Sequence, residues 1–243
     1  MKTVILSILL SCITAINAQW WDQGEKIEGN GNVINKTRNL SEYDQIKVSN
    51  SLDVLLVSGT EGNLTVTAES NLIPYITTEI EGGILKLNIK KGYYLKPSKS
   101  NKLLITVPFK DINAVTLAGS GDINSEAVIK SNDFTTKISG SGDIKLAVEA
   151  TNIESFITGS GDIKLKGATE NLICKVTGSG GLSAYDLNAK KVEASLTGSG
   201  DIEITVIQAL KARVIGSGDI DYKGNPEKED TAVSGSGDIT KKG

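Results

Sequence analysis

The motif Gly-Ser-Gly-Asp-Ile recurs through the second half of the chain at nearly constant spacing. Its copies begin at residues 119, 140, 159, 178, 198, 216 and 235, so the intervals are 21, 19, 19, 20, 18 and 19 residues. Only the fourth copy departs from the motif and reads Gly-Ser-Gly-Gly-Leu from Gly178. A fixed period of this length is typical of repeat proteins, in which each unit contacts only its neighbours along the stack.

Within one unit, apolar residues alternate with polar ones over residues 163–166 and again over 172–177. Alternation with a period of two predicts strands that bury one face. A unit of this size cannot close a core alone, but stacked units bury a continuous apolar column that includes Cys174. We therefore predict an all-β fold, a right-handed parallel β-helix (solenoid) with coils of about 19 residues.

The two glycines of each motif are predicted to be structural corners of the coils. Glycine adopts turn conformations that other residues reach only at a cost. The predicted corner glycines are Gly119, Gly121, Gly140, Gly142, Gly159, Gly161, Gly178, Gly180, Gly198, Gly200, Gly216, Gly218, Gly235 and Gly237.

The part before the repeats is also rich in strand signals, but it lacks the period. Six segments between residues 46 and 107 favour strands, and Gly82-Gly83 predicts a hairpin turn between two of them. We expect an N-terminal segment at 19–41, an irregular β part at 42–110 and the repeat β-helix at 111–243. Residues 42–243 are expected to form one continuous domain, in which the irregular part supplies wide coils or a cap.

Residues 1–18 have the pattern of a secretory signal peptide, with a basic start, an apolar stretch and Ala18 before the expected cleavage point. An alternative is lipidation at Cys12, which would leave a very short signal. The expected location is across the inner membrane, in the periplasm, on the outer-membrane surface or outside the cell. No membrane span is expected in the mature chain.

The composition excludes several classes of function. The chain has no histidine, which excludes Ser-His-Asp catalysis and most zinc sites. Its net charge of −3 gives no basic field for nucleic acid. We expect no catalytic residues and no cofactor.

One aspartate per unit follows the corner glycines, and we expect these carboxylates to stack in a row. The structural interpretation is that each aspartate bonds backbone N–H groups of its own corner. The alternative is a row of carboxylates that binds calcium or sugar, although stacked carboxylates repel one another. The candidate metal-binding residues are Asp122, Asp143, Asp162, Asp201, Asp219 and Asp238.

Phe156 and Ile173 are predicted to point outward from neighbouring coils. Together they form a candidate apolar contact patch, which a ligand or a second copy of the chain would cover.

Several segments in a fixed order resemble a known family. They are Arg38-Asn39-Leu40, the stretch Tyr43 to Val48, Asp53-Val54, Asn71-Leu72 and Gly83 to Leu87, followed by the serial corners. Over roughly residues 30 to 240 the chain resembles the family of the auto-transporter adhesin head GIN domain. The resemblance implies a β-helix of the bacterial cell envelope with an adhesin-like role.

The sequence therefore predicts a non-enzymatic adhesin-like or structural protein that presents a flat face to a glycan or a protein. The alternative is a calcium-dependent glycan binder, or a polysaccharide-processing enzyme, that uses the aspartate row.

Overall fold

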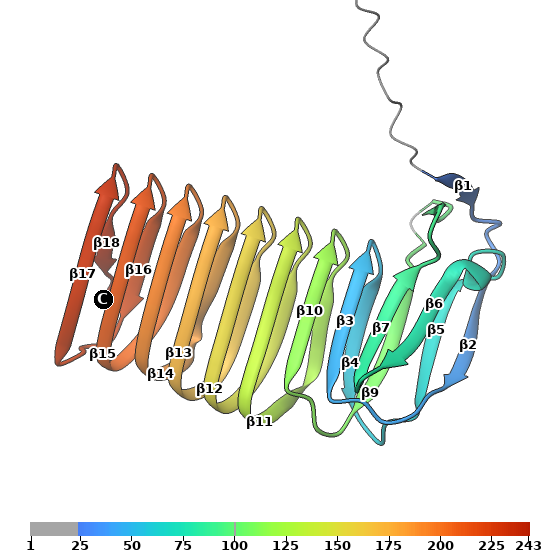
Figure 1. Cartoon of the computed structure of the whole chain (residues 1–243), viewed down its shortest axis with the longest axis horizontal. Coiled ribbons are helices and arrows are strands. Elements are labelled where there is room, and N and C mark those ends of the chain that lie inside the picture. Colours follow the sequence, from blue (N-terminus) through green and yellow to red (C-terminus); the bar gives the residue numbers. More distant parts are fainter. Residues whose placement is uncertain (1–23, 100) are drawn as a thin grey trace, which may run out of the picture.

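The repeats stack as coils of a parallel β-solenoid in the computed structural model, which describes residues 24–99 and 101–243 (Figure 1). The register places Gly119 beside Gly140 and Gly159 beside Gly178, so equivalent positions of successive coils form columns. The prediction of a parallel β-solenoid is confirmed. The strands of this region are β10 (Ala114–Gly119), β11 (Ile123–Gly140), β12 (Ile144–Gly159), β13 (Ile163–Gly178), β14 (Gly181–Gly198), β15 (Asp201–Gly216), β16 (Asp219–Lys223), β17 (Lys228–Gly235) and β18 (Ile239–Lys241).

The irregular part continues this stack by two further coils. One contains β3 (Gln45–Asn50) and β4 (Asp53–Ser58), which pair in parallel with β10 and β11. The next contains β7 (Ile84–Ile89) and β9 (Leu104–Phe109), which pair in parallel with β3 and β4. The β3–β4 coil thus lies between two coils that both follow it in sequence.

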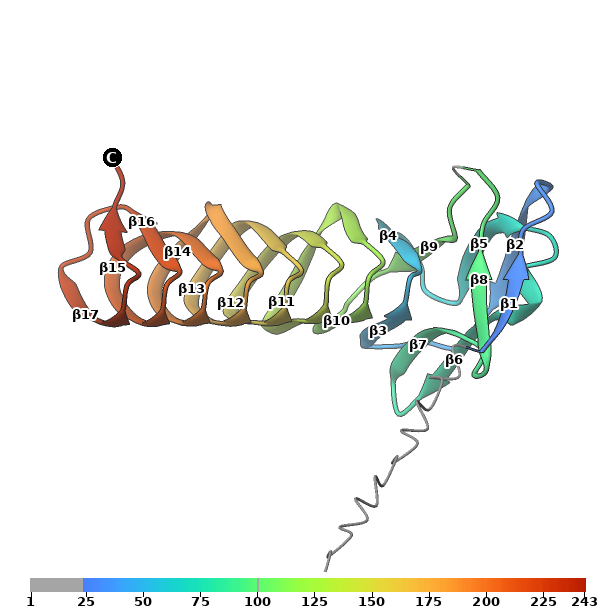
Figure 2. The same ribbon diagram turned by 90° about the horizontal axis from the view of Figure 1, so that it is seen from above.

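Antiparallel strands close this end of the stack (Figure 2). Strand β6 (Ile76–Glu81) pairs antiparallel with β7, and β5 (Asn63–Glu69) joins β9 to the outermost strand, β2 (Val33–Asn39). The predicted hairpin is confirmed, because Gly82 and Gly83 connect β6 to β7 with φ of 58° and 76°. A short 3₁₀ turn (Ile73–Tyr75) precedes β6, while β1 (Glu25–Glu28) and β8 (Tyr93–Lys96) form a separate parallel pair.

Alternate residues of the coils before β17 point inward and form columns of mostly apolar side chains. Leu172, Cys174 and Val176 are buried, as the alternating pattern predicts. Burial raises the pKa of the Cys174 thiol to about 12, so it remains protonated and packs as a small apolar group. Thr136 and Ser155 occupy the same inward column as Cys174, and their hydroxyl groups are buried without a hydrogen-bond partner in the structure.

The corners show why two glycines recur in each coil. Gly159 has φ of +121°, and a Cβ atom there would lie 2.3 Å from the carbonyl oxygen of Gly140 in the preceding coil. At Gly161 a Cβ atom would lie 2.2 Å from the carbonyl oxygen of Gly142. The same Gly140 carbonyl accepts hydrogen bonds from the backbone N–H groups of Ser160 (2.9 Å) and Gly161 (3.1 Å). Close backbone contact between coils therefore requires glycine at both positions.

The last coil differs from the others at its inward positions. Glu229 lies beside Leu210 in a column that is apolar in the preceding coils, and Thr231 lies beside Ala212. Every residue of β17 is exposed.

The expected signal peptide and Cys12 lie outside the described residues. Within 24–99 and 101–243, no helix has the length and apolar character needed to cross a membrane.

Candidate functional site

The predicted aspartates do form a row, but their carboxylates bond between coils. Asp162 accepts a hydrogen bond from the backbone N–H of Gly181 (2.7 Å), and Asp219 accepts one from the N–H of Asp238 (2.8 Å). Longer bonds of the same kind link Asp122 to the N–H of Asp143 and Asp201 to the N–H of Asp219.

The prediction that each aspartate bonds its own corner is wrong for these four residues. The reason is that the nearby donors of each corner are already used. For example, the N–H groups of Ser141 and Gly142 both donate to the Gly119 carbonyl of the preceding coil. The carboxylate instead meets the N–H group that lies one strand spacing away in the next coil.

The row begins one coil earlier than the repeats indicate. Asp53 accepts a hydrogen bond from the N–H of Asp122 (3.1 Å) and lies 3.2 Å from the ammonium group of Lys102. Its coil has a disguised corner, Asn50-Ser51-Leu52-Asp53-Val54, in which Asn50 pairs with Gly119 and has φ of +67°. The dipeptide Asp53-Val54 matches the Asp-Ile of the motif, so it could have indicated this corner. The corner was not recognised in the sequence because Asn50 and Leu52 stand where the motif has glycines.

The structure offers no cation cage along this row. Among residues 24–99 and 101–243, no three His, Cys, Asp or Glu side chains lie together so that they could hold a metal ion. Gly181 interrupts the row between Asp162 and Asp201.

The two residues of the predicted apolar patch lie on one outward face, among charged neighbours. Phe156 lies beside Lys137 and Lys175 in the register, and the Lys137 ammonium group is 5.1 Å from the centre of its ring. Ile173 lies beside Glu154 and Glu193. Both side chains are half-buried. Ile173 lines the groove described next.

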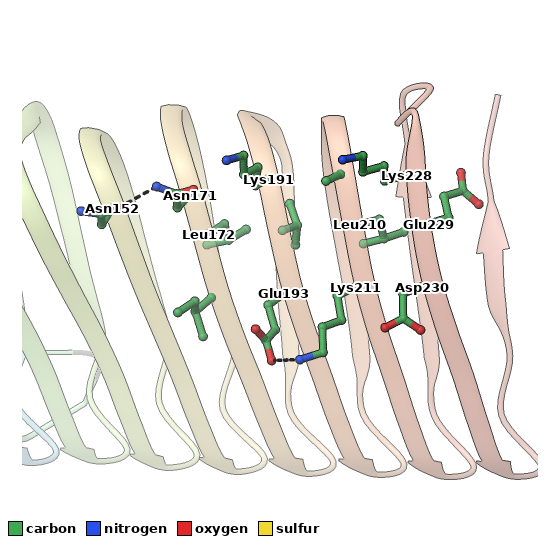
Figure 3. Close-up of a pocket in the computed structure, with 13 residues that line it drawn as sticks. Asn152, Asn171, Leu172, Lys191, Glu193, Leu210, Lys211, Lys228, Glu229 and Asp230 are labelled. Atoms are coloured by element: carbon green, nitrogen blue, oxygen red, sulfur yellow. Dashed lines mark hydrogen bonds and ion pairs between the residues drawn. The ribbon is translucent and has the colours of Figure 1, made fainter.

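A shallow groove of about 500 Å³ crosses this face from β12 to β17 (Figure 3). Two columns of side chains flank it. We call the first the amide–lysine row, which consists of Asn152, Asn171, Lys191, Ala209 and Lys228. We call the second the ion-pair row, which consists of Ile173, Glu193, Lys211 and Asp230. Leu172, Val192 and Leu210 form the floor between them, and Glu229 completes the lining.

The acidic groups of the ion-pair row already have cationic partners. The Lys211 ammonium group lies 2.8 Å from the Glu193 carboxylate, and its hydrogen bond lowers the pKa of Glu193. Arg213 donates to the Asp230 carboxylate at 2.6 Å and lowers the pKa of Asp230 in the same way. Both carboxylates are therefore held in the ionised form.

The amide–lysine row begins with a hydrogen-bonded ladder and ends with two unpaired cations. Asn171 donates to the side chain of Asn152 (2.8 Å), which donates to Asp133 (2.6 Å). Lys191 and Lys228 form no hydrogen bond or ion pair through their side chains with any residue that the structure describes. Figure 3 shows both lysines on one line with the two asparagines.

The groove lies where the coils change length. The coils that begin at Gly178 and Gly198 span 20 and 18 residues, and the β14–β15 register shifts after Ala184 and again after Ala189. The outward side chains of β14 and β15 are therefore displaced along the strands relative to one another at these shifts. The lysines of the groove were missed because nothing marks them in sequence, but the uneven intervals locate the irregular coils.

Comparison with known proteins agrees with this architecture. The family described as "Putative auto-transporter adhesin, head GIN domain" matches residues 42–226. A search of curated proteins finds no match.

Solved structures share the fold. A putative adhesin from Bacteroides fragilis has 25% sequence identity and a TM-score of 0.82, covering 89% of this chain and 100% of its own. A protein from Parabacteroides distasonis, named a putative lipid binding protein, has 29% identity and a TM-score of 0.76, with coverage of 90% and 100%. A putative adhesin from Parabacteroides merdae, at 21% identity and a TM-score of 0.72, covers 90% of this chain and 100% of its own and shows the fold alone. Because the family match spans most of the sequence, the chain belongs to the family of the auto-transporter adhesin head GIN domain.

Proposed function

We propose that the protein is a non-enzymatic, adhesin-like binding protein of the cell envelope, and that the groove is its ligand-contact surface. The observation that carries the proposal is the groove itself, in which unpaired cations, amides and the half-buried apolar side chains of Ile173 and Ala209 lie on adjacent strands. The adhesin names of the family and of solved relatives support this role.

The chemistry of the groove supports binding without catalysis. Glycoside hydrolysis needs a carboxyl group that stays protonated to act as an acid. In the groove, Lys211 and Arg213 lower the pKa values of Glu193 and Asp230, which opposes such a role.

We propose secretion across the inner membrane to the cell envelope, which the signal-peptide pattern of residues 1–18 and the auto-transporter adhesin description of the family support.

Glycan and protein arrays test the proposal when they are run with the wild-type chain, with Ala209→Trp and with Ser141→Trp. Ala209 lies in the groove, so the indole is expected to fill it and weaken ligand binding. Ser141 is an exposed corner residue outside the groove and serves as the control.

We expect the wild-type chain to bind a ligand whether or not divalent cations are chelated. Ala209→Trp should abolish this binding, and Ser141→Trp should leave it unchanged. Binding that is abolished by the chelator but unchanged in Ala209→Trp would favour a calcium-dependent site on the aspartate row. Failure to bind any glycan or protein would overturn the proposal.

A further inference from the structure

The unpaired lysines of the groove have a defined spacing. In the register, Lys191 lies beside Ala209, and Ala209 lies beside Lys228. The two lysines are thus two strand spacings apart, roughly 10 Å. The small side chain of Ala209 leaves the space between them open.

The surrounding charges leave these two cations available. Glu193 and Asp230 are paired with Lys211 and Arg213, and Glu229 accepts a hydrogen bond from the Tyr222 hydroxyl (3.1 Å). At a separation close to the Debye length, two ammonium groups repel each other only weakly in physiological salt. An anionic group that approaches either lysine therefore finds an ammonium group without a competing partner.

The other lining residues of the groove indicate which class of anionic molecule the two lysines could bind. Leu172, Val192 and Leu210 are only 1%, 4% and 2% exposed, so the floor offers no slot for an acyl chain. The exposed apolar surface of the groove comes instead from the half-buried side chains of Ile173 and Ala209. Small apolar contacts of this kind suit the C–H face of a sugar ring. Asn171 adds an amide on the same line, which can bond sugar hydroxyl groups.

We propose that the groove binds an acidic polysaccharide, with the chain parallel to the solenoid axis and two of its carboxylates on Lys191 and Lys228. Asn171 bonds hydroxyl groups of the sugar next to the first carboxylate, and Ile173 and Ala209 pack against the rings. This inference rests on the proposed binding function and specifies the class of ligand.

The test compares polygalacturonate with its methyl-esterified form, which has the same backbone without free carboxylates. The variant Lys191→Gln/Lys228→Gln removes both cations of the groove. The control Lys145→Gln/Lys164→Gln makes the same change of net charge at two exposed lysines outside the groove. Circular dichroism and thermal melting verify that both variants fold.

We expect the wild-type chain to bind polygalacturonate more weakly as salt rises, and to bind the ester poorly. The groove variant should lose about ten-fold or more in affinity, which corresponds to the loss of charge-assisted contacts. The control should stay within about two-fold, as expected for exposed charges distant from the ligand.

Three results would overturn the inference. Equal losses in both variants would indicate non-specific attraction. Binding to phosphatidylglycerol vesicles without binding to polygalacturonate would indicate a membrane surface instead. The third result is that the chain binds neither polygalacturonate nor the vesicles but does bind an array ligand, and that Ala209→Trp abolishes this binding. It would overturn the acidic-polysaccharide inference and leave the proposed binding function intact.

Discussion

At the scale of single residues, the stack tolerates little at its corners and leaves two hydroxyl groups unsatisfied in its core. A corner glycine touches the backbone of the preceding coil, while the serine beside it faces solvent. Neighbouring residues of one motif are therefore expected to differ widely in their sensitivity to substitution.

Gly159→Ala should lower the free energy of unfolding by about 3 kcal/mol. The new methyl group meets the Gly140 carbonyl and the residue must keep a positive φ, and each of these effects is destabilising. Urea unfolding measures the change. Ser160→Ala, at the exposed adjacent position, should change stability by less than about 0.5 kcal/mol. Equal effects of the two substitutions would contradict the contact between coils.

Two buried threonines should respond in opposite directions when valine replaces them. The Thr136 hydroxyl has no partner, so Thr136→Val should stabilise the fold by about 1 kcal/mol. The Thr169 hydroxyl lies within hydrogen-bond distance of the carbonyl groups of Thr151 (3.1 Å) and Asn171 (3.0 Å), so Thr169→Val should destabilise it by about 1 kcal/mol. Urea unfolding of both variants under the same conditions is the measurement. Destabilisation by Thr136→Val would show that its hydroxyl has a partner in solution.

At the scale of elements, a buried carboxylate holds the N-terminal segments together. Glu69, at the end of β5, accepts hydrogen bonds from the backbone N–H groups of Gly31 (2.5 Å) and Ser98 (2.9 Å), and also from the Ser98 hydroxyl. Burial by itself raises the pKa of Glu69, but these donors together outweigh it, and the net pKa lies below the ordinary 4.5. The ionised form thus connects the segment before β2 to the loop after β8.

Acid should loosen this connection before it unfolds the repeats. Because the pKa is lower in the folded state, the stabilisation is fully present above the unfolded value and is lost as pH falls through the folded value. The amides of Gly31 and Ser98 should lose protection from hydrogen exchange as pH falls below 4.5, the ordinary pKa of a glutamate, once the intrinsic exchange rate is corrected for pH. In Glu69→Gln their protection should be lower at pH 7 and nearly independent of pH. Unchanged protection in the wild-type chain at pH 3 would contradict this role of the ionised Glu69.

The elements also show what the sequence can and cannot reveal. Alternation and the motif period predict the coils, because every unit repeats the same local pattern. The bonds of Asp162 and Asp219 depend on the neighbouring coil, so reasoning within one corner misassigned them. The groove depends on the offset between β14 and β15. In the sequence, only the uneven intervals between the Gly-Ser-Gly motifs indicate this offset.

At the scale of the whole molecule, the two ends of the stack are finished differently. Antiparallel strands cover the first coils, whereas the last coil replaces apolar inward residues by Glu229 and Thr231. Charged and polar residues on an exposed edge strand oppose pairing with another chain.

Replacing these polar groups should make the chain self-associate. In Glu229→Leu/Thr231→Val the apolar columns continue to the open end, so a second molecule can bury them. Sedimentation velocity should show association that increases with protein concentration. Ala232→Leu adds apolar surface at the outward side of the same strand and should sediment like the wild-type chain under the same conditions. A double variant that sediments like the wild-type chain would show that other features oppose association at this end.

The position of β3 and β4 inside the stack has a consequence for biosynthesis. Whether at the ribosome or during export, the chain emerges from its N-terminus, so this coil appears before either neighbour, since one neighbour contains β7 and β9 and the other contains β10 and β11. Assembly can then extend in both directions from an early template, first toward the cap and afterwards along the repeats. The coil that forms first is finally enclosed on both sides. Its register must therefore match the hydrogen-bonding pattern of both coils that pair with it later.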